Sequence, residues 1–477
     1  MLNKKNKFYI TTTLPYVNSN PHIGFAAEII RADVLARYHR QLGDDVFFNT
    51  GTDEHGLKIY RKAKEEGIET QKYVDKYAKR FDDLKVALNL SYNSFIRTTD
   101  KNHIKLAQEF WKRCADNGDI YKKNYKIKYC VGCELELTES ELVNGKCPHH
   151  PNQELETIEE ENYFFRWSKY QDKLLKFYEK NPNFVVPSKR FNEIKNFIKQ
   201  GLKDFSISRL KEKMPYGVQV PNDNKHVMYV WFDALTNYIN CLDWAKNSKK
   251  FKDFWPGIQV AGKDNLRQQT AMWQAMLMSA GIQNSKQVLV FGFITSNGQK
   301  MSKSIGNVVN PNDLIKKYNT DATRYYLLSE LQPFEDSDFT EEKFKIKYQA
   351  DLANGLGNLV SRTSALLEKN NIKLDISINK KSKLTNQIND EMKKYRFDNA
   401  LKIIWQKIKE MDEYLSDKAP WKISNEKEIK EILKFTAQNI LNIAYSLQPF
   451  MPETAEKIKK QFLEKQIKKQ EPLFLRL

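Results

Sequence analysis

The pattern of apolar and polar residues changes from strand-like to helix-like within the first forty positions. An apolar, β-branched run covers Phe8 to Thr13, and a polar turn follows at Asn18-Ser19-Asn20-Pro21. The pattern then predicts a helix from about Gly24 to Arg40. Because the first N–H groups of a helix have no partner within it, this junction could bind phosphate.

His22 lies beside this predicted helix start. Its ring could donate a hydrogen bond or a proton to a phosphate oxygen, and Gly24 would let a ligand approach closely. Taken alone, the stretch is equally compatible with a surface histidine in a turn.

Strand and helix patterns alternate up to about residue 115, which is typical of a doubly wound, Rossmann-like parallel α/β sheet. The apolar stretch Val46 to Asn49 ends in GTDEHG. Such sheets bind ligands at the carboxyl ends of their strands, so we expect Asp53 and His55 near the first turn. Asp53 could cap a helix, or its carboxylate could hold a substrate ammonium.

Between residues 118 and 225 the pattern leaves the sheet and contains two short cysteine knuckles. Cys130, Cys133 and Cys147, with His149 or His150, supply four ligands for tetrahedral zinc. The two-residue spacing from Cys147 favours His150. Four protein ligands close such a site, so we predict structural rather than catalytic zinc; unrelated buried cysteines are the alternative.

The sheet pattern resumes near His226, where HVMYVWFDALTNYI predicts a strand followed by a helix. Helical spacing places Trp231, Ala234, Leu235 and Tyr238 on one face, which could be core or the wall of an apolar pocket. A further strand ends at AGKD, where Asp264 is placed to accept hydrogen bonds from ribose hydroxyls.

Val288 to Ile294 is the most apolar strand candidate, and the loop TSNGQKMSKSIGN follows it. Lys300 and Lys303 present two ammonium groups next to two serine hydroxyls. Positive charge on a movable loop suits a triphosphate, because phosphate chemistry develops negative charge on oxygens.

Beyond about residue 345, strand patterns nearly vanish and an all-α region follows. Asn358 and Arg362 recur on one helix face, where they could be solvated or could contact unpaired bases. Trp421 could stack on a base or belong to the core. The neighbouring face is apolar and carries Leu352, Leu356, Leu359, Thr363 and Leu367.

Composition indicates a large, basic, globular chain. Its 477 residues suggest about three domains, and a net charge of +18 favours a polyanionic partner, although lysine also promotes solubility. No apolar run is long enough to span a bilayer, and the basic start lacks a signal core. We therefore expect a cytoplasmic protein without a membrane partner.

The segments PHIG at 21 to 24 and KMSKS at 300 to 304 are similar to the paired signatures of class I aminoacyl-tRNA synthetases. Their order and spacing resemble the methionyl-tRNA synthetase family in particular. Almost the whole chain follows the family order, through GTDEHG, the zinc knuckle, YVWFDALTNY, GKD and the AP-W segment near residue 420.

The resemblance implies a ligase that works in two steps. Methionine attacks the α-phosphate of ATP to give methionyl-adenylate and pyrophosphate, and the acyl group then moves to the 3′-terminal adenosine of tRNA(Met). Asp53 would hold the methionine ammonium. The other methionine-site residues would be Leu14, Tyr16, Val230, Trp231, Ala234, Leu235, Tyr238 and Gln269.

By the same resemblance, ATP would arrive with Mg²⁺, and catalysis would depend on His22, Lys300 and Lys303, with Lys303 as the main charge on the phosphates. The anticodon would be bound by Asn358, Arg362 and Trp421. The ATP-binding residues would be His22, Gly24, Gly262, Asp264, Ile294 and Lys303.

Two segments depart from the family pattern. Phe25 stands where the family usually has the last histidine of H-I-G-H, so one imidazole near the phosphates is missing. Gln268 and Gln269 replace a common aromatic–histidine pair. A glutamine can still hydrogen-bond a thioether or a neighbouring tyrosine, which keeps Gln269 among the pocket residues.

We predict five segments along the chain. These are a first Rossmann half at 1–117, an insertion with the zinc knuckle at 118–225 and a second Rossmann half at 226–295. A loop and connector at 296–345 and an α-helical anticodon-binding domain at 346–477 follow. The absence of a further strand-rich segment favours a monomer.

Two alternatives remain at this point. A cysteinyl-type class I synthetase would need a metal in its amino-acid pocket, whereas this knuckle lies in an insertion. A tRNA-binding homologue without catalysis would fit Phe25, but the intact lysine loop and Asp53 weigh against it.

Overall fold

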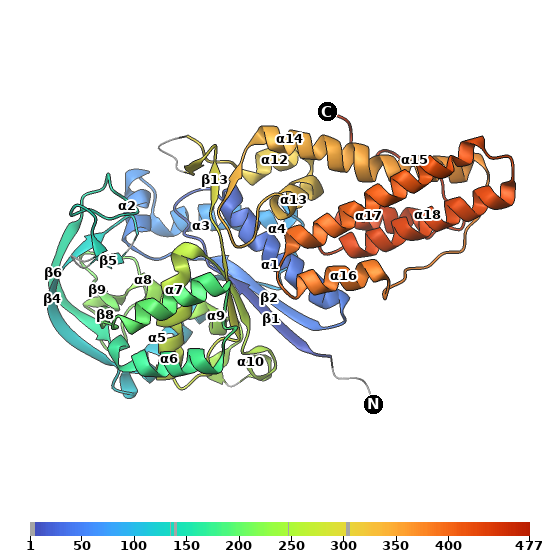
Figure 1. Cartoon of the computed structure of the whole chain (residues 1–477). Helices are drawn as coiled ribbons and strands as arrows, with labels where there is room; N and C mark the ends of the chain where they lie inside the picture. The colour runs from blue at the N-terminus through green and yellow to red at the C-terminus, as the bar shows by residue number, and fades with distance from the viewer. Residues whose placement is uncertain (1–4, 134, 138–140, 247, 302–305) are drawn as a thin grey trace. The chain divides into compact units, whose positions relative to one another are not determined.

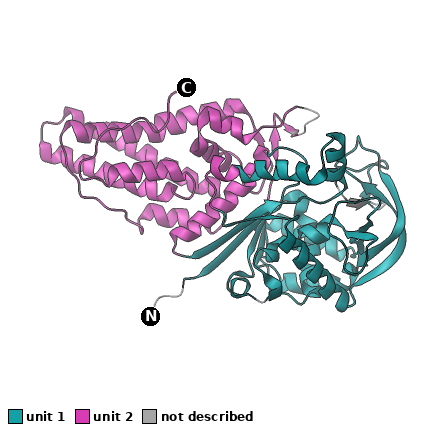
Figure 2. Cartoon of the chain, turned by 180° about the vertical axis from the view of Figure 1, so that it is seen from behind, with its two compact units in different colours: residues 1–21, 44–83, 92–290 teal, residues 22–43, 84–91, 291–477 magenta. Residues whose placement is uncertain are grey.

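The computed structural model describes residues 5–133, 135–137, 141–246, 248–301 and 306–477 (Figure 1). The chain forms two compact units, which Figure 2 distinguishes by colour. Unit 1 contains residues 1–21, 44–83 and 92–290, and unit 2 contains residues 22–43, 84–91 and 291–477. The chain passes repeatedly from one unit to the other, so each unit is built from separate segments.

A six-stranded sheet forms the centre of unit 1, in the order β3-β2-β1-β11-β12-β7. β1 is parallel to both β2 and β11, β2 is parallel to β3, and β12 is parallel to β7. The predicted parallel α/β sheet is therefore confirmed. Its strands are β1 (Lys7–Thr12), β2 (Asp45–Thr52), β3 (Ser94–Arg97), β7 (Val185–Val186), β11 (Ile258–Gly262) and β12 (Gln287–Phe291).

The central strands β1 and β2 are buried along almost their whole length. All of β1 after Lys7 and nearly all of β2 are buried, as expected for strands covered on both faces. Their buried polar groups pair across the sheet: the Thr12 and Thr50 hydroxyls are 2.8 Å apart. The helices of unit 1 include α2 (Leu57–Glu65), α3 (Thr70–Asp82), α5 (Lys101–Asp116), α6 (Gln171–Lys180), α7 (Ser188–Lys199), α10 (Lys249–Phe254) and α11 (Trp273–Ser279).

The insertion forms a separate antiparallel sheet in the order β5-β4-β6-β8. β4 (Ile120–Cys130) and β6 (Glu156–Phe165) pair along almost their whole length. β5 (Leu135–Leu137) and β8 (Phe205–Ser206) flank them. The segment around the cysteines thus leaves the parallel sheet, as the sequence pattern predicts.

Two local predictions were wrong. β10 (His226–Met228) does not join the central sheet but pairs antiparallel with β9 (Ser208–Leu210). The single helix expected after it is two short helices, α8 (Val230–Ala234) and α9 (Asn237–Asn240). Side chains between them compete for the helix carbonyls: Thr236 Oγ1 donates to Asp233 O, and Asn237 Nδ2 donates to Ala234 O, both at 2.7 Å.

Unit 2 contains α1 (Ile23–Gln41) and most of the later helices. The predicted apolar stripe at 352, 356, 359, 363 and 367 is fully buried, although its first part lies in a π-helical stretch, η6 (Tyr348–Gly357). The strand expected over 288–294 is interrupted, because β13 (Ile294–Ser296) belongs to a small sheet with β14 (Gln299–Lys300) and β15 (Ser337–Phe339).

Apart from α4, the remaining helices of unit 2 follow one another along the last third of the chain (Figure 1). α17 and α18 form an antiparallel hairpin whose turn begins at Ala419 in a left-handed conformation. None of the described helices is both long and apolar enough to cross a membrane. The helices are α4 (Leu84–Ala87), α12 (Pro311–Tyr318), α13 (Thr320–Ser329), α14 (Glu341–Lys347), α15 (Asn358–Lys369), α16 (Lys383–Met392), α17 (Phe397–Lys418), α18 (Glu426–Leu447) and α19 (Pro452–Phe462).

An internal ion pair connects the segments of unit 2. Asp33 on α1 and Arg324 on α13 are both fully buried, with Oδ2 and Nη2 2.8 Å apart. Arg324 also donates to the carbonyls of Leu88, Pro449 and Phe450. Although burial acts to raise the pKa of Asp33, the charges of Arg324 and Arg37 hold it below its usual value. The pair therefore links α1 to three later parts of the same unit.

Candidate functional sites

The loop after β1 and the loop after β2 pair with each other at the carboxyl edge of the sheet. The Asp53 N–H donates to Pro15 O at 3.0 Å, and the Val17 N–H donates to Asp53 O at 3.2 Å. Tyr16 is therefore bridged to Asp53, which is buried with 3% of its surface exposed. Asp53 does not cap α2, whose N-cap is Gly56. The sequence alternative of a capping aspartate is thus excluded for this helix.

Most predicted thioether-wall residues gather in unit 1. Tyr16 and Trp231 pack on a small buried cluster that contains Val230 and two further tyrosines, Tyr129 and Tyr229. The other predicted wall residues, Leu14, Ala234, Leu235 and Tyr238, are buried, and the last two belong to the main core. The stripe predicted to be either core or pocket wall is therefore divided. Leu235 and Tyr238 belong to the core, whereas Trp231 is partly exposed and can line a pocket.

Gln269 fixes the Tyr238 side chain. Its Nε2 donates to the Tyr238 hydroxyl, and its Oε1 accepts from Gln259 Nε2 at 3.1 Å. The Tyr238 carbonyl accepts from the Tyr9 hydroxyl at 2.7 Å. Gln269 lies in a π-helical turn, η5 (Gln268–Met272), whose residues are buried. The departure from the family pattern at this position therefore retains a contact with the tyrosine.

The predicted ribose-binding residues follow β11 at the same edge of the sheet. β1 and β11 run in parallel, and the Thr13 N–H donates to Val260 O at 3.0 Å. Gly262 ends β11, and Asp264 lies exposed in the 3-10 turn η4 (Lys263–Asn265). The carboxylate is therefore accessible to a ligand at the strand end.

His22 is the N-cap of α1 in unit 2. Its Nδ1 accepts from the Gly24 N–H at 3.0 Å, and burial lowers the pKa of the ring. A neutral ring with Nδ1 engaged carries its proton on Nε2, which leaves that N–H as a donor. A Cβ on Gly24 would lie only 2.8 Å from His22 Cε1, so any other residue at this position would displace the His22 ring.

The two signature segments approach each other within unit 2. The Ile23 N–H donates to Val309 O at 3.0 Å, and Met301 Cε lies 3.6 Å from the position a Gly24 Cβ would take. Ile294, which begins β13, is buried. The Lys300 backbone, in β14, pairs with Thr295 in β13. Lys303 lies outside the described residues.

Three cysteines and one histidine converge in the insertion. One ligand atom from each of Cys130, Cys133, Cys147 and His150 lies within 4.8 Å of the other three. Cys133 Sγ is 3.1 Å from His150 Nδ1 and 3.5 Å from Cys147 Sγ. Tetrahedral zinc places neighbouring ligand atoms roughly 3.5 Å apart, so the donor set fits this ion.

The knuckle backbone favours thiolate at one of these cysteines. Burial acts to raise the pKa of Cys147, but hydrogen bonds, including those from the backbone of His149 and His150, bring it below its usual value. His150, not His149, belongs to the four-residue cluster, in agreement with the spacing argument.

The three predicted anticodon residues occupy the helical part of unit 2. The Arg362 guanidinium lies 4.6 Å from the centre of the Trp421 ring. Arg362 also donates to Asp412 at 3.3 Å and to Ser416 at 3.1 Å. Trp421 is 44% exposed, which excludes the core alternative, and Asn358 is partly exposed. Arg362 and Trp421 thus form one accessible surface.

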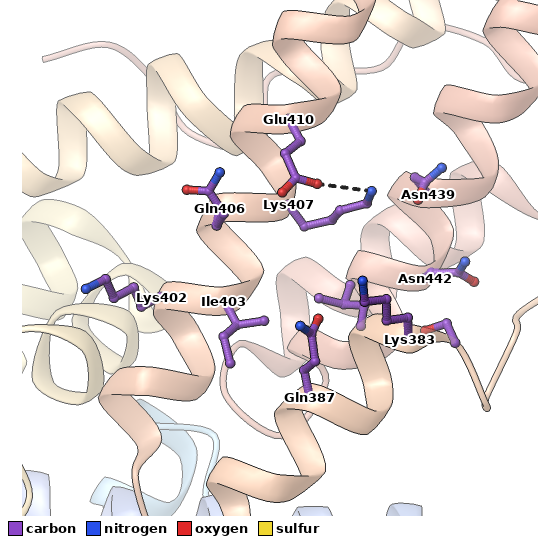
Figure 3. A pocket seen from close by; sticks show the side chains of 11 residues that line it. Lys383, Gln387, Lys402, Ile403, Gln406, Lys407, Glu410, Asn439 and Asn442 are labelled. Carbon is purple, nitrogen blue, oxygen red and sulfur yellow. Dashed lines mark hydrogen bonds and ion pairs between the residues drawn. The ribbon is translucent and has the colours of Figure 1, made fainter.

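A second polar surface of unit 2 is a groove of about 510 Å³ between α16, α17 and α18 (Figure 3). Lys383, Lys402 and Lys407 line it together with amide side chains, and Lys407 pairs with Glu410 at 3.3 Å. The predicted anticodon residues are not among its lining residues.

A buried carboxylate that the sequence pattern did not single out lies behind the predicted methionine site. Asp233 on α8 contacts His55, which follows β2, and His103 on α5. The contacts join positions 178 and 130 residues apart in the chain. The only sequence signal was the polar position of Asp233 within an apolar segment.

Comparison with known proteins finds matches along nearly the whole chain. The family model described as tRNA synthetases class I (M) matches residues 8–158 and 150–364, and the model of the anticodon-binding domain of tRNA ligase matches residues 377–476. The chain is 42% identical to the methionine–tRNA ligase of Clostridium acetobutylicum, covering 96% of this chain and 74% of that protein. It is 41% identical to the Rhizobium meliloti enzyme, covering 94% and 90%.

A solved structure resembles the chain in fold as well as in sequence. The Mycobacterium tuberculosis methionyl-tRNA synthetase in complex with methionyl-adenylate superposes with a TM-score of 0.91 at 36% identity. The match covers 96% of this chain and 94% of that one. The similarity thus includes fold and sequence over nearly the full length of both proteins.

Proposed function

Since the chain belongs to the methionyl-tRNA synthetase family of class I aminoacyl-tRNA synthetases, we propose how its residues divide the work of a methionine–tRNA ligase. The enzyme activates methionine with ATP, forming methionyl-adenylate and releasing pyrophosphate. It then transfers the methionyl group to the 3′-terminal adenosine of tRNA(Met). The cysteinyl-type and non-catalytic alternatives are not favoured, because the curated relatives are methionine–tRNA ligases.

Methionine binds in unit 1, at the carboxyl edge of the sheet. The Asp53 carboxylate holds the ammonium group, and Tyr16 with Trp231 bounds the thioether side chain. Gln269 orients the Tyr238 hydroxyl toward this pocket. The observation that most directly supports this assignment is the backbone pairing of the Tyr16 segment with Asp53. The remaining wall residues are Leu14, Val230, Ala234 and Leu235.

The ATP phosphates bind at the start of α1. His22 donates from Nε2, because its Nδ1 already accepts from the helix backbone. The positive end of the α1 helix dipole favours negative charge there, and Gly24 leaves the approach open. The Phe25 side chain offers no hydrogen-bond donor to the phosphates. The remaining positive charge therefore has to come from Lys300 and Lys303 of the lysine loop.

The other nucleotide contacts follow from the strand ends. Gly262 and Ile294 lie along the nucleoside, and the Asp264 carboxylate accepts from the ribose hydroxyls. Mg²⁺ enters with ATP, because it prefers phosphate oxygens to an all-protein cage. A bound Mg²⁺ would neutralise part of the phosphate charge.

One Zn²⁺ ion would be held by Cys130, Cys133, Cys147 and His150. With four protein ligands it would stabilise the insertion and take no part in the reaction. Metal analysis of the purified protein should give one zinc per chain, and Cys147→Ser should lose it.

The tRNA anticodon binds at Asn358, Arg362 and Trp421, where a base can stack on the indole and hydrogen-bond to the amide or guanidinium. The five-segment division, the monomeric state and the cytoplasmic location stay predictions. Analytical ultracentrifugation would test the monomer.

Pyrophosphate exchange into ATP, measured with each of the twenty amino acids and without tRNA, tests the proposed chemistry. Exchange should occur with methionine. Lys303→Ala should slow this exchange, because it removes about 3 kcal/mol of transition-state stabilisation, the scale of one lost oxyanion donor. Exchange with cysteine but not methionine, or a fully active Lys303→Ala variant, would contradict the assignment.

A further inference from the structure

Asp233 joins two histidines inside unit 1. Its Oδ2 is 2.5 Å from His55 Nδ1, and its Oδ1 is 2.7 Å from His103 Nε2. The three side chains are almost completely buried, with at most 5% of each exposed. Both oxygens of one buried carboxylate are therefore used to hold separate segments of the chain.

The surrounding hydrogen bonds fix the direction of donation. Asn240 Nδ2 lies 3.2 Å from His103 Nδ1, and Asn240 Oδ1 accepts from Trp244 Nε1 at 2.8 Å. His103 Nδ1 thus accepts, so its Nε2 carries the proton and donates to Asp233. Burial acts to raise the pKa of Asp233, yet the two histidines lower it to about 2. Asp233 is an ionised acceptor.

The tied segments are those assigned to methionine binding. His55 follows Asp53 by two positions in the loop after β2. Asp233 follows Trp231 by two positions and directly precedes Ala234 in α8. The 2.5 Å contact therefore connects the loop that carries the ammonium partner to the helix that carries the thioether wall.

We propose that Asp233 is a positioning residue that sets the spacing between Asp53 and the Trp231 wall, and thereby the enzyme's affinity for methionine. The inference rests on the proposed methionine site. Asp233 contacts no substrate. It acts through His55, while His103 anchors it to α5, so that the pocket is held in shape before methionine arrives.

The test measures pyrophosphate exchange in the full-length enzyme. Asp233→Ala and His55→Ala should each raise KM for methionine by about tenfold or more, because the two walls are no longer held together. KM for ATP should stay within about twofold of the parent value, since neither residue belongs to the nucleotide site. Asp233→Asn should restore most of the affinity, because its amide can still accept from His103 and can donate to the other tautomer of His55.

Asp119 offers a matched control in the same unit. It is also buried, and it accepts from the Tyr170 hydroxyl at 2.5 Å and from Ser279 at 2.8 Å, away from the methionine-site residues. Asp119→Ala should lower Tm as Asp233→Ala does, yet leave KM for methionine unchanged.

The outcomes separate this inference from the proposed function. Failure of the parent enzyme to exchange with methionine would contradict the function itself. An active parent with an unchanged methionine KM in Asp233→Ala, or an equal rise in Asp119→Ala, would overturn the positioning role. If Asp233→Ala does not fold, an unchanged KM in His55→Ala overturns it instead.

Discussion

The predicted methionine pocket and the predicted anticodon surface each contain a tryptophan, but their residues lie in opposite surroundings. Asp53 is 3% exposed and is held by backbone pairing, whereas Trp421 is 44% exposed and is held by one cation–π contact with Arg362. We therefore expect the pocket to be shaped before its ligand binds. We expect the surface to gain much of its order from bound RNA, because exposed contacts contribute little by themselves.

This difference predicts unequal costs of mutation. Asp53→Ala should lower kcat/KM for methionine by about 100-fold or more, because it removes the buried partner of the ammonium group. Pyrophosphate exchange at varied methionine concentration measures the effect. Binding of tRNA(Met), followed by filter retention, should stay at the parent value, and a parallel loss there would show that Asp53 supports the fold instead.

Trp421→Ala should weaken tRNA(Met) binding by about 1–3 kcal/mol, the scale of one lost stacking contact. Methionine-dependent exchange without tRNA should be unaffected. Trp421→Phe keeps an aromatic face and should recover part of the affinity. Equal damage to exchange and to tRNA binding would mean that the indole has a structural role.

Salt separates the two regions without any mutation. If the surface makes two phosphate contacts, raising the salt from 50 to 200 mM should weaken tRNA binding by about tenfold, because binding releases counterions. The methionine KM should barely change, since the Asp53 site is buried and poorly screened. A methionine KM that followed salt as steeply would break the proposed contrast.

Asp412→Asn should have the smallest effect. Asp412 is 40% exposed and lies 3.3 Å from Arg362, so the pair contributes about 0–1 kcal/mol to stability. Removing its charge should leave Tm nearly unchanged and tighten tRNA binding by less than about 1 kcal/mol. Differential scanning fluorimetry and the same filter assay check both statements.

The sequence was most informative where function or periodicity acts locally. Apolar periodicity predicted β1, α1 and the stripe from Leu352 to Leu367, which is buried as expected. The cysteine spacing predicted the cluster and the preference for His150. These features depend on neighbours a few residues away, so a single sequence contains them.

The missed features depend on distant partners. The break between α8 and α9 follows from competing hydrogen bonds of Thr236 and Asn237, and the periodic pattern does not include such competition. Asp233 finds His103 across 130 residues, which no local motif announces. Trp421 could not be assigned to core or surface before its exposure was known, because tryptophan is compatible with both.

The buried pair of Asp33 and Arg324 has a consequence for synthesis on the ribosome. At roughly 5–20 residues per second, Arg324 emerges on the order of 15–60 s after Asp33, and the Pro449 and Phe450 carbonyls emerge later still. During that interval α1, which is buried on most sides in the finished protein, lacks its contact with α13. Unit 2 therefore cannot complete its folding while the first half of the nascent chain is being made, and α1 is the segment we expect a chaperone to shield.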